Sequence, residues 1–102
     1  MSTELIFRNR NDLEKYFGPL TFAKFIRACR TSKDMNQKEF AKFLGIAPGT
    51  LCDLEKGRQL VSPELAKKYA KKCGLSEKVA ITASLEDQLR KAKIKYHVEL
   101  VA

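Results

Sequence analysis

Histidines and paired cysteines are scarce in this sequence. It has a single histidine, His97, and its three cysteines, Cys29, Cys52 and Cys73, show no C-x-x-C spacing. An odd number of distant cysteines argues against a disulfide framework or a zinc site, so we expect buried free thiols in a reducing compartment. A glycine-rich phosphate loop, a metal-ligand signature and a nucleophile motif are also missing. We therefore expect no enzymatic activity, no catalytic residues, no metal and no cofactor.

Long apolar runs and negative charge are in short supply as well. No apolar run approaches the roughly 20 residues that span a bilayer, and the start does not read as a secretory signal. We expect a cytoplasmic protein with no membrane contact. The chain carries 20 Lys and Arg against 12 Asp and Glu, a formal net charge of +8. Such a charge attracts polyanions, although solubility alone would also explain it.

The 102 residues suffice for one domain, and start and stop signals divide most of it into helices. The sharpest signal is at Asn36, where Glu39 stands at capping-box spacing and Met35 and Phe40 at the spacing of a hydrophobic staple. Prolines and glycines mark other helix starts and ends. The expected helices cover residues 22–32, 37–44, 48–56, 63–73 and 77–92.

Apolar residues at helical spacing mark the faces that we expect to be buried. These residues are Phe22, Phe25, Ile26, Cys29, Leu51, Leu54, Leu65, Ala66, Tyr69, Ala70, Cys73, Val79, Ala80, Ala83 and Leu89. The lysines at positions 67, 68, 71 and 72 fall between the apolar residues of their helix and indicate a solvated face.

The two ends differ from the middle. Residues 1–20 form an N-terminal extension, with a short strand or arm around Leu5–Phe7 and a short helix over 12–17. Residues 93–102 include Tyr96–Val101, which alternates apolar and polar residues as strands do. The expected fold is all-α: a five-helix helix-turn-helix domain over 21–92, with the N-terminal extension and a C-terminal β-strand.

The run from Thr21 to Gly74 resembles the DNA-binding domain of phage-repressor-like regulators, the Cro/C1 or XRE family. The segment that carries the resemblance is NQKEFAKFLGIAPGTLCDLEKGR, residues 36–58. It joins two short helices through a tight turn containing Gly45, which is the helix-turn-helix pattern. The resemblance covers about half the chain and implies a lambda-repressor-like fold with the helix Pro48–Lys56 in the DNA major groove, which admits one helix.

The resemblance also implies which residues meet DNA. Gln37 and the amides beside it would grip a phosphate, which fixes register without reading sequence. An Arg30–Glu55 pair would orient that arginine toward the backbone, unless the two charges never meet. The full set of implied DNA contacts is Arg30, Gln37, Lys38, Pro48, Gly49, Thr50, Cys52, Asp53, Lys56 and Arg58, with Lys33 adding positive charge nearby.

The expected recognition helix departs from strong readers of bases. It offers no Arg, Gln or Asn for a bidentate contact, and Ala47 cannot cap its start. Thr50 can contact a phosphate or a thymine methyl, and Asp53 can accept from cytosine. We expect modest discrimination or help from contacts elsewhere; the alternative is a helix that no longer binds DNA. Cys52 is either a small residue tolerated on this face or a redox-sensitive one.

One module makes few base contacts, so we expect a homodimer that reads two half-sites of a palindromic operator as a repressor. The expected contact surface is the last helix and the tail, through Tyr96, Val98 and Leu100. The tail strand would pair with its twofold copy, with the N-terminal strand or with another protein. The alternative function is an antitoxin of the HigA or HipB type, which binds its operator and also neutralises a toxin protein.

Overall fold

The computed structural model describes residues 18–101, and these fold into five helices. The helices are α2 (Phe22–Ser32), α3 (Gln37–Leu44), α4 (Pro48–Glu55), α5 (Pro63–Cys73) and α6 (Glu77–Lys91). The five predicted helices are confirmed, with ends that differ by no more than one residue. The predictions on the N-terminal strand or arm and on the short helix over 12–17 lie outside the described residues.

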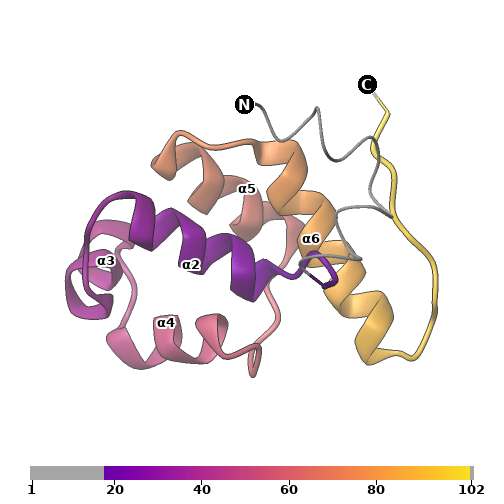
Figure 1. The fold of residues 1–102 in the computed structure, drawn as a ribbon, viewed down its shortest axis with the longest axis horizontal. Coiled ribbons are helices and arrows are strands. Elements are labelled where there is room, and N and C mark those ends of the chain that lie inside the picture. Colours follow the sequence, from indigo (N-terminus) through magenta and orange to yellow (C-terminus); the bar gives the residue numbers. More distant parts are fainter. Residues whose placement is uncertain (1–17, 102) are drawn as a thin grey trace.

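Helix α2 crosses the middle of the domain, with α4 along one side of it and α6 across its N-terminal end (Figure 1). Helix α3 packs on α4, and α5 packs on α6. The shared core includes Phe22, Ile26 and Phe40, none of which has more than a trace of exposed surface. Phe22 also lies against Tyr69 of α5, with 6.5 Å between the ring centroids. The core thus fixes the orientation of α4 from two sides.

The α3–α4 turn has strong local determinants. The Asn36 side chain accepts from the Glu39 amide at 2.8 Å, and the Glu39 carboxylate accepts from the Asn36 amide at 3.0 Å, so the capping box is formed. Gly45 ends α3 at φ 77°, in the left-handed region that a side chain would strain. The Ile46 amide then donates to the Ala41 carbonyl, the long bond of a Schellman ending. These bonds set the short connection into α4.

The start of α2 is capped a second time, by a residue of α6 that lies much later in the chain. The Thr21 side chain accepts from the Lys24 amide, as expected of a local cap. The Phe22 amide donates to Asp87 of α6 at 3.0 Å. Asp87 is held in turn by Arg90, which also donates to the Leu20 carbonyl. The C-terminal part of α6 is therefore attached to the start of α2.

Two of the residues expected in the core are at its edge. Leu65 is 39% exposed and Val79 is 41% exposed, so the prediction was wrong for both. Each precedes the true buried face by one residue, since Ala66 and Ala80 are fully buried. One residue is about 100° around a helix, enough to turn a side chain from the core to its rim. The lysines of the predicted solvated face of α5 are exposed.

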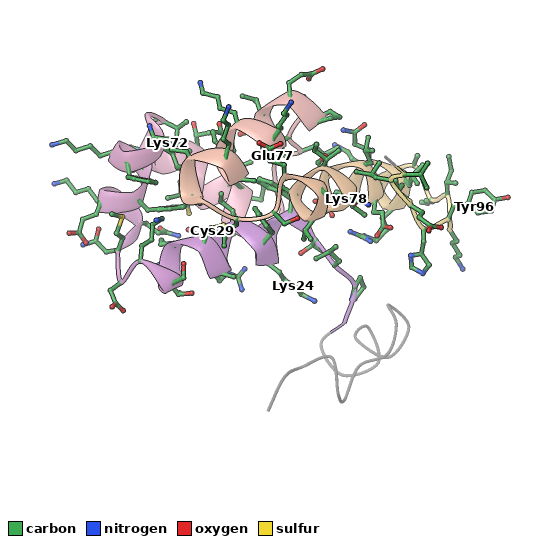
Figure 2. The ribbon with its side chains drawn as sticks, turned by 90° about the horizontal axis from the view of Figure 1, so that it is seen from above. Lys24, Cys29, Lys72, Glu77, Lys78 and Tyr96 are labelled. Atoms are coloured by element: carbon green, nitrogen blue, oxygen red, sulfur yellow. The ribbon has the colours of Figure 1, made fainter. Side chains whose placement is uncertain are left out.

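The predicted C-terminal β-strand is wrong: residues 93–101, the described part of the tail, contain no strand. The Val98 amide donates instead to the carboxylate of Glu86, a residue of α6 that is only 1% exposed. A strand needs a second backbone beside it, and this side chain takes the place of that partner. Tyr96 is 76% exposed and points away from the helices (Figure 2). Alternation in sequence therefore reflects a tail laid along a helix.

Cys29 and Cys73 face each other in the core, where they join α2 to α5. Both are buried free thiols, and Figure 2 shows Cys29 enclosed among the helices. Burial, with the neighbouring Cys73, raises the pKa of the Cys29 thiol to about 12, and burial also raises the pKa of Cys73. Cys52 is half-buried on α4. Only the thiolate is a nucleophile, so the two core cysteines are chemically quiet.

This difference predicts the thiol chemistry of the folded chain. At pH 8 we expect one of the three thiols, Cys52, to react quickly with a disulfide reagent such as DTNB. Cys29 and Cys73 should react only when urea unfolds the protein. The Cys52→Ala variant is the control and should show no fast phase. Fast reaction of more than one thiol in the native protein would contradict the buried pair.

Candidate nucleic-acid interface

The N-terminal turn of α4 is the most open part of the helix-turn-helix unit. Pro48 occupies the first helical position, and Ala47 makes no side-chain cap, as its sequence predicted. Pro48 and Gly49 are exposed, while Thr50, Cys52 and Asp53 are half-buried. The opposite face is anchored by Leu51 and Leu54, which are buried. The N-terminal end of α4 is therefore exposed, while its opposite face is buried in the core.

Glu55 holds α4 to the two helices that precede it. The residue is only 3% exposed, and its carboxylate accepts two hydrogen bonds from Arg30 of α2, at 2.9 and 3.1 Å. This is the fork geometry of a strong arginine–carboxylate pair. Arg30 also donates to the Met35 carbonyl at 3.1 Å, just before α3. The structure thus brings together the two residues that the resemblance paired.

Gln37, at the start of α3, belongs to the same cluster. Its side-chain amide donates to Glu55 at 3.3 Å, a long hydrogen bond. The side chain is half-buried at the first position of the helix, where unpaired amides and the positive end of the dipole lie. Lys38 beside it is exposed. An anion at this end of α3 would meet backbone amides, the Gln37 side chain and the Arg30 guanidinium.

Cationic residues flank the unit on both sides. Lys56 and Arg58 follow α4 and are exposed. Arg58 lies 3.6 Å from Asp53, and the two side chains are 63% and 43% exposed, so solvent keeps this ion pair weak. Lys33 reaches over the Phe43 ring at 5.2 Å, and Lys72 of α5 lies over the same ring at 5.5 Å. These cationic side chains come from the segment after α4, from the C-cap of α2 and from α5.

Arg27 is a residue of this site that sequence reasoning missed. It sits one turn before Arg30 on α2 and donates to the Glu55 backbone carbonyl at the end of α4. Sequence gives no sign of this contact, because any exposed helix can carry an arginine. Together Arg27 and Arg30 fix both the main chain and the side chain of Glu55.

Within residues 18–101, no group of three His, Cys, Asp or Glu residues is placed to hold a metal ion. His97 lies in the tail with its Nδ1 3.7 Å from the Glu86 carboxylate. Across the same part of the chain, no helix combines the length and apolar character needed to cross a bilayer. The chemistry of the site is that of hydrogen-bond donors and positive charge.

Two short helices joined by a tight glycine turn, with an open second helix and cationic flanks, define a helix-turn-helix DNA-binding protein. The family model described as helix-turn-helix matches residues 26–79, more than half of the chain. The chain therefore belongs to this family, in its Cro/C1 (XRE) type, and is a DNA-binding transcriptional regulator. Comparisons with curated proteins and with solved structures found no match.

The Glu55 cluster predicts a large difference between two acids of one helix. Glu55→Ala should lower the free energy of unfolding by about 2–3 kcal/mol, because it leaves the largely buried Arg30 without its partner. Asp53→Ala, the control, should cost less than about 1 kcal/mol, because its ion pair with Arg58 is exposed. Urea denaturation followed by circular dichroism measures both. Equal costs would contradict the role given to Glu55.

Proposed function

We propose that the chain is a homodimeric repressor that binds a palindromic operator through α4. The observation that carries the proposal is the Glu55 cluster, which fixes α4 against α2 and α3 with its N-terminal turn outward. In this arrangement Thr50 and Asp53 face base edges, while Gln37, Lys38 and Arg30 hold the phosphate backbone. Such a regulator works in the cytoplasm, with double-stranded DNA as its partner.

Phosphate contacts supply most of the affinity in this proposal. Pro48, Gly49 and Cys52 provide a close fit of α4 to the groove and no bidentate base contact. Lys56 and Arg58 add charge at the other end of the helix. Half-sites about one helical turn apart, read by two copies, would supply the specificity that one copy lacks.

The tail supports the homodimer. Ile94, Tyr96 and Val101 are exposed apolar residues on a segment without a strand partner among the described residues. Clustered apolar side chains on a surface favour a protein contact. Val98 and Leu100 are half-buried, and Val98 is held by Glu86, so these two position the tail while Tyr96 is available to a second copy.

The same apolar tail favours a second function, that of an antitoxin that neutralises a toxin protein and regulates its own operon. A toxin would compete for the surface around Tyr96, while DNA would still meet α4. A neighbouring reading frame for a small ribonuclease-like or kinase-like protein would favour this function over a repressor alone. The two functions share the DNA site and differ in what covers the tail.

A mobility-shift titration tests the proposed function. The DNA is the region upstream of the chain's own coding sequence, compared with a scrambled duplex at two salt concentrations. We expect tighter binding to the upstream DNA, dependent on a palindrome and weaker at higher salt as counterions are released. Equal weak binding to both duplexes would reject the specific repressor and leave only attraction by charge.

Substitutions separate positioning from reading. Gln37→Ala should weaken binding to all sequences alike, by about threefold to tenfold, because it removes a backbone contact. Thr50→Ala or Asp53→Ala should change the consensus recovered by selection from random duplexes. If neither substitution alters the consensus, α4 does not read bases. A loss with Gln37→Ala confined to one sequence would contradict its contact with phosphate.

A further inference from the structure

A basic groove lies at the end of α4 that is remote from its open N-terminal turn. Its walls are the first half of α2, the segment that follows α4 and the C-terminal end of α6, and its volume is about 610 Å³. Pockets for small ligands typically have volumes of roughly 300–1,000 Å³. The cationic residues that line this α2–α6 groove are Lys24, Arg27, Lys56, Arg58, Arg90 and Lys91.

The acids of the groove are already engaged in hydrogen bonds. Among the described residues that line it, only Glu55 and Asp87 carry carboxylates. Glu55 accepts from Arg30, and Asp87 accepts from Arg90 and from the Phe22 amide. The groove therefore has an excess of positive charge. Its cationic residues come from α2, from the segment after α4 and from α6.

The position and the lining residues of this groove distinguish it from the exposed N-terminal turn of α4. Helix α4 has eight residues, a length of about 12 Å, so Pro48 and the groove are at opposite ends of it. The lining of the α2–α6 groove contains cationic residues from α2, from the segment after α4 and from α6, whereas Pro48 and Gly49 at the open turn of α4 carry no charge. Leu60 adds an apolar side chain to the lining. Several cationic residues around one hollow, with an apolar neighbour, suit a compact anion with an organic part.

We propose that the α2–α6 groove binds a small polyanion, a ligand with two or more phosphate groups. Phosphates would accept charge-assisted hydrogen bonds from Lys56 on one wall and Lys91 on another. Arg27 lines the groove and also donates to the Glu55 carbonyl at the end of α4. A phosphate bound by Arg27 would therefore share this guanidinium with the Glu55 carbonyl and so be linked to the Glu55 cluster through one side chain.

Pyrophosphate is the probe, titrated into the full chain and followed by nitrogen–proton NMR and by calorimetry, with no DNA present. We expect saturable binding with shifts concentrated at Thr21, Gly57 and Gln59 of the groove. Lys56→Gln combined with Lys91→Gln should weaken binding about tenfold or more, because two charge-assisted contacts are lost. The control, Lys67→Gln combined with Lys71→Gln, removes the same charge from the exposed face of α5 and should stay within about twofold of wild type. Thermal melts verify that every variant is folded.

Two results would overturn the proposal. Equal weakening in both double variants would mean that net charge alone attracts pyrophosphate, and shifts confined to the starts of α3 and α4 would place the anion on the DNA face. A duplex arm separates the two sources of phosphate: Lys91→Gln alone should bind DNA within about twofold of Lys67→Gln alone. A clear loss specific to Lys91→Gln would assign the groove to the DNA backbone and reject the small ligand. Because the pyrophosphate arm contains no DNA, its result is independent of the proposed repressor function.

Discussion

The arrangement of the helix-turn-helix unit depends on one carboxylate, that of Glu55. It receives the Arg30 guanidinium and the Gln37 amide, and its backbone carbonyl receives Arg27. Two helices, α2 and α3, therefore converge on the last residue of α4. A buried carboxylate is unfavourable without partners, and here the partners belong to the helices that α4 must be oriented against. The requirement to satisfy this charge selects one angle of α4 among the many that apolar packing would permit.

This dependence links stability to the DNA face. Both Arg30 and Gln37 support Glu55, and both lie near the start of α3: Gln37 is its first residue, and Arg30 of α2 donates to the Met35 carbonyl just before it. A phosphate arriving there would meet donors that are already oriented, so less side-chain entropy is lost on binding. The Gln37 bond is the longest of the set, so under the proposed function Gln37 would exchange it for a phosphate while Arg30 keeps α4 in place.

Local signals in the sequence were enough to predict the helices. Asn36 and Glu39 form their capping box within four residues, and α5 begins with a Ser62 side-chain cap followed by Pro63. Such bonds depend on neighbours in the chain, so they can be read without knowledge of the fold. The Arg30–Glu55 contact was accessible only through resemblance to a family. Nothing in the local sequence of either residue selects the other.

The failures have the opposite character. Asp87 caps α2 although it lies 65 residues later in the chain, and Glu86 takes the Val98 amide that a strand partner would have taken. Both residues are acids of α6, and the amphipathic pattern of a helix assigns acids to its solvent-facing side. Leu65 and Val79 fail because a rim position and a core position differ by one residue. Each of these outcomes is decided by contacts between distant segments, which periodicity does not contain.

The distribution of the acids also determines what the net charge means. Glu39, Glu55, Glu86 and Asp87 all accept hydrogen bonds from the chain itself, through backbone amides or arginines. Their negative charge is therefore directed inward or compensated locally. Most lysines of the described residues are exposed, so they place positive charge on the outer surface. A field of that kind draws a polyanion toward the protein before any contact forms, and under the proposed function the orientation that the Glu55 cluster gives α4 would then determine how this helix meets DNA.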